Sequence, residues 1–305
     1  GDKTTPLKQI SDEAMKSTPS IERCIVLKRT KSNINMQKNR DFWWHEQMEN
    51  SNSDCPIEIM DSEDPLFILY TSGSTGKPKG IQHSTAGYMI YTEYSFRNVF
   101  QYEDGDIYWC TADIGWITGH SYIVYGPLLA GATTVMFEGT PSYPDAGRFW
   151  KIVEENQINI FYTAPTAIRA LEAKGMEFVT PYDLSSLKVL GTVGEPINED
   201  AWHWYNKEIG KDNCPIVDTW WQTETGGIMI SNLANVTPAK PSFATLPLPG
   251  IQPCLVNEKG NELEGNSVEG RLCIKFPWPS IARTIYGNHK RFKETYFSAF
   301  RNKYF

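Results

Sequence analysis

Short runs of β-branched and aromatic residues alternate with amphipathic stretches through the middle of the chain. The apolar runs at residues 66–70, 107–111, 133–137, 158–162, 187–191 and 216–220 have the length and composition of buried strands. Apolar residues recur at helical spacing in 145–156, 166–174 and 198–209, the last with Asn198 at the N-cap position and Gly210 at C′. Strands that alternate with helices predict an α/β fold with a mainly parallel sheet and helices on both faces.

The two ends of the chain have a different pattern. A helix is predicted at 10–18 and a strand at 24–27, followed by a polar, acidic crossing from 46 to 65. After residue 232 the chain is rich in proline and glycine, and strands at 251–256 and 271–276 predict a small, distorted β unit. We therefore expect the remainder of a preceding α/β lobe and a linker at 1–60, an α/β subdomain at 61–235, and a β-rich subdomain at 236–305.

Composition narrows the class of protein. Lys and Arg number 29 against 36 Asp and Glu, a net charge of −7, so a binder of nucleic acid with a dense basic face is not expected. The basic and aromatic stretch at 286–305 is interpreted as ordinary protein surface near a domain junction. Residues 114–137 carry no Asp, Glu, Lys or Arg, but their glycines, proline and histidine favour a buried strand, loop and helix over a membrane span. Six cysteines without a C-x-x-C spacing favour thiols in the cytoplasm and no structural zinc.

A loop rich in glycine, hydroxyl and lysine residues follows the first strand of the middle region. Its residues are Thr71, Ser72, Gly73, Ser74, Thr75, Gly76, Lys77, Pro78, Lys79 and Gly80. Glycines let backbone N–H groups approach a phosphate, hydroxyls donate to its oxygens, and lysines neutralise its charge. Pro78 stands where a Walker A loop needs Ser or Thr, and Thr71 stands where it needs Gly. A plain Gly/Ser surface loop has a similar composition, but the position directly after a strand favours a polyphosphate site.

This loop resembles the phosphate loop of the adenylate-forming superfamily, which includes acyl-CoA synthetases, luciferases and adenylation domains of peptide synthetases. Residues 108–120 (YWCTADIGWITGH), 193–196 (VGEP) and 218–227 (DTWWQTETGG) resemble, in order, motifs of the AMP-forming acetyl-CoA synthetases. The resemblance implies the large N-terminal domain of that fold. It implies ATP-dependent activation of acetate to acetyl-AMP, followed by transfer to coenzyme A. A ligase for propionate or another short acid, and a nucleotide-binding module without catalysis, are the alternatives.

The resemblance also implies residue roles around the nucleotide. Thr71 to Lys77 would hold the β- and γ-phosphates of ATP, and Gly194, Glu195 and Pro196 would contact adenine. The nucleotide would be lined by Asp218, Thr219, Trp220, Trp221, Gln222 and Thr223, with Thr223 near the α-phosphate. Glu224 would bind Mg²⁺, a cation that suits one carboxylate with phosphate oxygens and water. The implied catalytic residues are Thr223, Glu224 and Lys77.

The implied acyl pocket consists of Trp116, Ile117, Thr118, Val193 and Trp221. The Trp221 indole would close a pocket that relatives with longer substrates leave open, which favours acetate and makes propionate a slower second substrate. Thr118 and Ser142 would contact coenzyme A, although Ser142 replaces the amide side chain expected there. Residues 119–123 lack the closing glycine of a nucleophile elbow, so no serine hydrolase is predicted.

The family pattern continues on both sides of this sequence. A catalytic lysine on a small C-terminal domain belongs to that pattern, and it does not occur in these 305 residues. The sequence therefore leads us to expect a central fragment of a longer enzyme, inactive alone, whose partners are small molecules.

Overall fold

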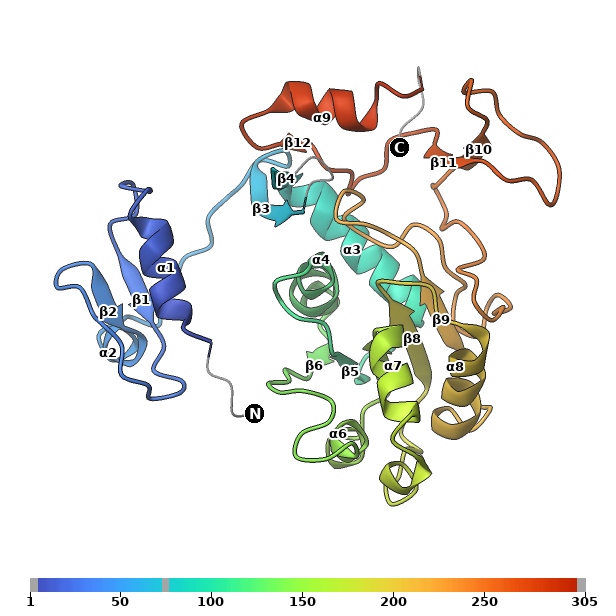
Figure 1. Ribbon diagram of the computed structural model, residues 1–305, viewed down its shortest axis with the longest axis horizontal. Helices are drawn as coiled ribbons and strands as arrows, with labels where there is room; N and C mark the ends of the chain where they lie inside the picture. Colours follow the sequence, from blue (N-terminus) through green and yellow to red (C-terminus); the bar gives the residue numbers. More distant parts are fainter. Residues whose placement is uncertain (1–4, 73–76, 301–305) are drawn as a thin grey trace. The chain divides into compact units, whose positions relative to one another are not determined.

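The computed structural model describes residues 5–72 and 77–300 of the chain (Figure 1). The chain forms two compact units, Gly1–Ile59 and Met60–Phe305. The predicted phosphate loop residues Gly73, Ser74, Thr75 and Gly76 lie outside the described residues. The three predicted subdivisions of the chain stay a prediction.

The first unit contains a buried ion pair between Lys8 and Asp41. Its elements are α1 (Leu7–Met15), β1 (Cys24–Val26), β2 (Asp41–Trp43) and α2 (Trp44–Glu49), with β1 parallel to β2. The Lys8 ammonium lies 2.7 Å from an Asp41 carboxylate whose side chain has no exposed surface. Hydrogen bonds from Arg40 and Lys8 hold the pKa of the Asp41 carboxyl well below its usual range. A buried carboxylate is tolerated here because it is doubly paired.

A five-stranded parallel sheet forms the centre of the second unit, as the sequence predicts. Its strands are ordered β6 (Thr133–Thr134), β5 (Ile107–Cys110), β7 (Ile160–Thr163), β8 (Val189–Val193) and β9 (Ile216–Thr219). Every neighbouring pair is parallel. The edge strand β6 is shorter than the predicted 133–137. The α/β fold class is confirmed.

Helices cover both faces of this sheet because its inner strands carry apolar side chains toward both faces. Tyr108 and its neighbours on one face pack against Phe96 and Phe100 of α3, while Trp109 on the other face packs against Phe149 of α6. Alternation along a strand sends successive side chains to opposite faces, so both faces need a cover. The covering helices are α3 (Thr85–Phe100), α6 (Arg148–Asn156), α7 (Pro165–Glu172) and α8 (Glu199–Trp204), which continues as η3 (Tyr205–Ile209) (Figure 1).

A second sheet carries the segment that flanks the predicted phosphate loop. β3 (Pro65–Thr71) runs antiparallel to β4 (Lys79–Ser84), and β12 (Thr284–Ile285) pairs with the other edge of β4. The predicted strand at 66–70 exists, but it belongs to this sheet and not to the parallel one. Helix α9 (His289–Tyr296) follows β12, and its Phe292 and Tyr296 pack against Ile81 of β4.

The remaining elements are short. β10 (Pro253–Val256) and β11 (Arg271–Ile274) form an antiparallel pair, and η2 (Met176–Phe178) is a single turn. The uncharged run after β5 forms α4 (Ile117–Gly119), η1 (His120–Tyr125) and α5 (Gly126–Leu129), with non-helical backbone at Tyr122. Within residues 5–72 and 77–300, no helix has the length and apolar character needed to cross a bilayer.

The C-terminal end of η3 differs from the predicted end of the 198–209 helix, in which Gly210 is expected at C′. Asn198 occupies the predicted N-cap, without a side-chain cap bond, but Gly210 is the C-cap residue with a right-handed φ of −81°. The left-handed conformation belongs instead to Lys211 and Asp212, with φ of 51° and 57°. Gly210 has a packing reason to be glycine, since a Cβ there would lie 2.8 Å from the Asn206 carbonyl oxygen.

Candidate active site

Three of the four sequence motifs lie at one edge of the parallel sheet. Residues 111–118 follow β5, 194–196 follow β8, and 220–224 follow β9. Because all five strands are parallel, their carboxyl ends meet at the same edge, where ligands bind in open α/β sheets. The fold therefore brings together segments that are about 100 residues apart in sequence.

A cavity of about 710 Å³ lies where this edge meets the β3–β4 hairpin. The two ends of the hairpin contribute Thr71, Ser72 and Lys79 to its lining, and the strand-end loops contribute two carboxylates, Asp113 and Glu224. The other described lining residues are Leu69, Tyr70, Gly115, Trp116, Ile117, Gln222 and Thr223. Charged groups of both signs and hydroxyls thus converge on one concave surface, as expected of a binding site for a charged ligand.

A buried histidine joins the hairpin to the loop after β9. His83 of β4 has no exposed surface, and its Nε2 lies 2.8 Å from the carbonyl oxygen of Thr223. Burial lowers the pKa of His83 to about 4, so the ring is neutral at pH 7. A carbonyl oxygen can only accept, so Nε2 carries the proton and donates it to Thr223. His83 thereby fixes the backbone beside Glu224.

Lys79 and Tyr296 meet at the carboxylate of Glu224. The Lys79 ammonium donates to the Tyr296 hydroxyl over 2.6 Å, and that hydroxyl donates to Glu224 Oε1 over 2.5 Å. Lys79 Nζ lies 3.3 Å from the same oxygen. Burial, followed by the bond to Glu224, raises the pKa of Tyr296, so the phenol keeps its proton. These contacts link β4, the loop after β9 and α9.

The residues present fit a polyphosphate with a bound cation. Thr71 belongs to the cavity lining, and its Oγ1 is buried with no hydrogen-bond partner among the described residues. Lys77 and Ser72 are exposed at the two sides of the loop. No cluster of three or more His, Cys, Asp or Glu side chains suited to a metal occurs in 5–72 and 77–300. A cation at Glu224 would therefore need ligand oxygens from elsewhere, which phosphates provide.

Comparison with known proteins identifies the family. The profile of the family described as AMP-binding enzyme matches residues 2–286 of this chain. The chain belongs to the AMP-binding enzyme family. It is similar to the acetyl-coenzyme A synthetases of Desulfatibacillum aliphaticivorans (57% identical), Rubrobacter xylanophilus (56%) and Escherichia coli O157:H7 (55%), each aligned over 305 residues. These alignments cover 99–100% of this chain and 47% of each relative, so the chain spans about half the length of the curated relatives that it matches. The predicted family is confirmed.

The predicted adenine segment lies at the end of β8, apart from the described cavity lining. Gly194 has φ of 97°, which a residue with a Cβ adopts at a cost. Glu195 accepts hydrogen bonds from Thr166 and, over 2.9 Å, from Arg169; these bonds, that of Thr166 first, lower the pKa of the Glu195 carboxyl. Pro196 is exposed beside them. These side chains shape the turn between β8 and α8.

Residues 218–223, at the end of β9 and directly after it, separate into buried and cavity-lining residues. Asp218 and Thr219 are the last residues of β9 and are 6% exposed. The Thr192 hydroxyl donates to Asp218 over 2.9 Å, and Thr219 donates to the Thr192 carbonyl over 2.8 Å. Burial raises the pKa of the Asp218 carboxyl. Trp220 pairs through its backbone with Ile230, whereas Gln222 and Thr223 line the cavity.

The predicted acyl residues occupy two neighbouring environments. Trp116 and Ile117 line the cavity, and the Trp116 side chain is 71% exposed. Trp221 packs against Tyr122 in a T-shaped arrangement, with ring centroids 5.0 Å apart, and joins the same hydrophobic cluster as Val193. Of the two residues predicted to contact coenzyme A, Thr118 is buried in α4 and Ser142 is exposed in the loop after β6. The predicted roles of these residues in binding the acyl group and coenzyme A stay predictions.

Sequence reasoning missed three residues that touch this region: His83, Arg291 and Tyr296. His83 carried no ligand spacing, and the other two belong to the stretch interpreted as surface. Arg291 donates to the carbonyl oxygens of Lys77, over 2.9 Å, and of Pro78, over 3.4 Å. No pattern in the sequence relates residues 77–79 to 291–296, because their proximity arises only when β12 pairs with β4.

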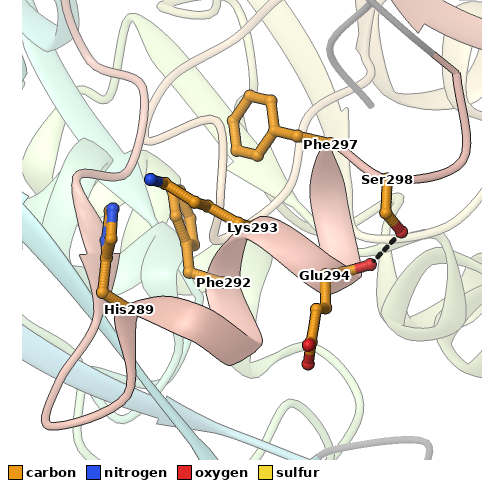
Figure 2. A pocket seen from close by; sticks show the side chains of 6 residues that line it. All are labelled: His289, Phe292, Lys293, Glu294, Phe297 and Ser298. Carbon is orange, nitrogen blue, oxygen red and sulfur yellow. Dashed lines mark hydrogen bonds between the residues drawn. The ribbon is translucent and has the colours of Figure 1, made fainter.

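A second cavity, of about 520 Å³, lies against α9 (Figure 2). Its described lining comes from one segment: His289, Phe292, Lys293, Glu294, Phe297 and Ser298. In Figure 2 the Ser298 hydroxyl donates to the Glu294 carbonyl oxygen of α9. Polar groups from different elements do not converge here, so the first cavity is the candidate active site.

Proposed function

We propose that this chain forms the phosphate- and acyl-binding part of an AMP-forming acetate–CoA ligase. The observation that carries the proposal is the 55–57% identity, over essentially the whole chain, with proteins named acetyl-coenzyme A synthetase. The convergence of two strand-end motifs, those after β5 and β9, and the ends of the phosphate hairpin on one cavity supports it. Because the chain spans about half of those relatives, the complete reaction belongs to the complete protein.

The first half-reaction is the attack of an acetate oxygen on the α-phosphorus of ATP. A carboxylate–phosphate bond forms, the bond to the β-phosphate oxygen breaks, and pyrophosphate leaves. Thr71, Ser72 and Lys77 are assigned to the β- and γ-phosphates, and Thr223 to the α-phosphate. Positioning and neutralisation of charge supply most of the rate enhancement in such a transfer. Mg²⁺ bound at Glu224 would withdraw charge from the phosphate oxygens.

In the second half-reaction the sulfur of coenzyme A attacks the acetyl carbonyl and AMP leaves. We assign Thr118 and Ser142 to coenzyme A and Trp116, Ile117, Thr118, Val193 and Trp221 to the acyl group. Trp221 is held on edge by Tyr122, which supports a rigid wall that admits a two-carbon acid more readily than a longer one. A cytoplasmic location is part of the proposal; it is supported by the acidic composition and by six cysteines that form no disulfide among the described residues.

The test is ATP–pyrophosphate exchange catalysed by the protein encoded by the full reading frame around this chain. We expect exchange to require an acid and to fall in the order acetate, propionate, butyrate. Glu224→Gln should reduce exchange by at least about 100-fold, because transition-state charge stabilisation is worth several kcal/mol. Faster exchange with propionate than with acetate would favour a propionate ligase. ATP binding without acid-dependent exchange would favour a nucleotide-binding module.

A further inference from the structure

Helix α9 touches the candidate active site at two points, although none of its residues belongs to the sequence motifs. We propose that Tyr296 and Arg291 are positioning residues for bound ATP and its metal ion. Tyr296 keeps Lys79 from forming a closer ion pair with Glu224, and Arg291 fixes the backbone where the phosphate loop ends. The inference rests on the proposed function, because it assumes that ATP occupies the cavity beside Glu224.

The direction of the hydrogen bonds defines what Tyr296 does. An ammonium only donates, so the Tyr296 oxygen accepts from Lys79, and the single phenol proton goes to Glu224. The hydroxyl therefore bonds to both the cation and the carboxylate, which are themselves 3.3 Å apart, so the three groups form a triangle. Both Lys79 and Tyr296 bond to the same carboxylate oxygen, Oε1, so neither uses Oε2.

Without the Tyr296 hydroxyl, the Lys79 ammonium would lose the acceptor that competes with Glu224 for its hydrogen bonds. Lys79 would then donate fully to Glu224, and a charge-assisted bond shortens to about 2.7–2.9 Å. A carboxylate paired in this way must give up the ammonium before it binds a divalent cation. Tyr296 thus keeps Glu224 available as a ligand, and its loss should weaken the response to Mg²⁺ and leave the binding of metal-free ATP unchanged.

Arg291 acts on a different part of the site. Its two terminal nitrogens donate to the successive carbonyl oxygens of Lys77 and Pro78, which form the exit of the phosphate loop into β4. The Asn288 side chain caps the helix by accepting from the Arg291 backbone N–H over 3.0 Å. Arg291 is therefore fixed at both its backbone and its guanidinium, and its loss should weaken ATP binding with and without metal.

The helix itself is rigidly placed against the hairpin. Phe292 and Tyr296 are buried with Ile81 of β4 and Ile285 of β12 in one hydrophobic cluster. Tyr296 is 5% exposed, so its ring stays packed when only the hydroxyl is changed. The two positioning contacts can accordingly be removed one at a time without removing the helix from its place.

Calorimetric titration with ATP of the protein encoded by the full reading frame around this chain, over a series of Mg²⁺ concentrations and in chelator, tests both assignments. Tyr296→Phe should raise the Mg²⁺ concentration for half-maximal tightening of ATP binding about 5–10-fold, the loss expected for one hydrogen bond to a charged group. Its affinity for ATP in chelator should match the wild type. Arg291→Gln should weaken ATP binding about 3–10-fold in both conditions, and Arg291→Lys should recover part of the loss.

Matched controls separate these effects from general damage. Tyr286→Phe changes an exposed tyrosine, 58% accessible, and Lys290→Met removes a neighbouring exposed cation; both should bind as the wild type does. Adding Lys79→Met to Tyr296→Phe should restore the normal Mg²⁺ midpoint, because the competing ammonium is gone. A purely structural role for Tyr296 predicts no such rescue.

Amide hydrogen exchange of residues 77–84 without nucleotide gives a measurement independent of binding. Arg291→Gln should speed exchange there and Lys290→Met should not. Variants that bind ATP as the wild type does at every Mg²⁺ concentration would overturn the inference and leave the proposed function intact. A complete wild-type protein that binds no ATP, with or without Mg²⁺, would overturn the proposed site and the inference together.

Discussion

Seven consecutive residues after Val217 show how different the roles within one motif are. Asp218 and Thr219 bond to Thr192 inside the sheet and are nearly inaccessible. Trp221 packs on Tyr122, while Glu224 lines the cavity. The sequence motif predicts a functional role for the whole segment. Only the residues beyond the end of β9, where the chain leaves the sheet, have side chains that can reach a ligand. Substitutions at 218 or 219 should therefore affect stability first.

Trp221 is the residue whose replacement should change substrate choice. Trp221→Gly in the complete enzyme should remove the wall beside Tyr122 and lower the ratio of kcat/KM for acetate over butyrate by about 10-fold or more, since pocket fit is worth about 1–3 kcal/mol per methylene. Steady-state kinetics across acids of increasing length measure this. Trp202→Ala, which removes a partly buried indole from the other hydrophobic cluster, is the control and should leave the ratio unchanged. An unaltered ratio in Trp221→Gly would refute the pocket assignment.

The elements that the sequence predicted well are those with one clear pattern. The strands predicted at 107–111, 158–162, 187–191 and 216–220 appear as β5, β7, β8 and β9, with ends that move by up to two residues. Helix α3 was not predicted, because aromatic and apolar residues occupy most of its surface and it is buried on several sides. Strand β12 has two residues, too few for any pattern, and exists only through pairing with β4.

Glycine at position 191 is required by the packing of α3 on the sheet. A Cβ on Gly191, in the middle of β8, would lie 2.6 Å from the Tyr162 ring and 3.0 Å from the Phe100 ring. Because both rings are fully buried, they have little room to move. We expect Gly191→Ala to lower the free energy of unfolding by about 1–3 kcal/mol, measured by urea denaturation. Wild-type stability in this variant would mean that the rings repack without cost.

At the scale of the whole molecule, the sequence allowed the candidate site residues to be predicted but not the tertiary contacts that join them. The four motifs located the carboxyl edge of the sheet and the hairpin, because their residues have local signatures. The contacts that join them, from His83 to Thr223 and from Tyr296 to Lys79 and Glu224, connect residues 72 to 217 positions apart. Such contacts follow from tertiary packing alone, and without an alignment nothing in one sequence marks them.

The buried His83 should make global stability depend on pH. Its pKa of about 4 lies below the value of about 6.5 for an exposed histidine, so between these values the unfolded chain binds the proton and the folded chain does not. Stability from this group is complete above pH 6.5 and falls by up to about 1.4 kcal/mol per pH unit toward pH 4, roughly 3 kcal/mol in all. Urea unfolding between pH 4 and 7 measures the slope. His83→Gln should show a shallower slope than the wild type, and equal slopes would contradict the assignment.

The pairing of β12 with β4 also has a consequence for the order of events on the ribosome. The hairpin that flanks the phosphate loop is complete in sequence by residue 84, but the other edge of β4 is covered only by Thr284 and Ile285. Some 200 residues must be translated before that edge is paired, and Arg291 and Tyr296 follow Ile285 by 6 and 11 residues. Until then the backbone N–H and C=O groups along this edge of β4 have no strand partner as the chain leaves the ribosome. An unpaired strand edge can associate with other chains. The candidate active site is thus among the last parts of this unit to be finished during synthesis.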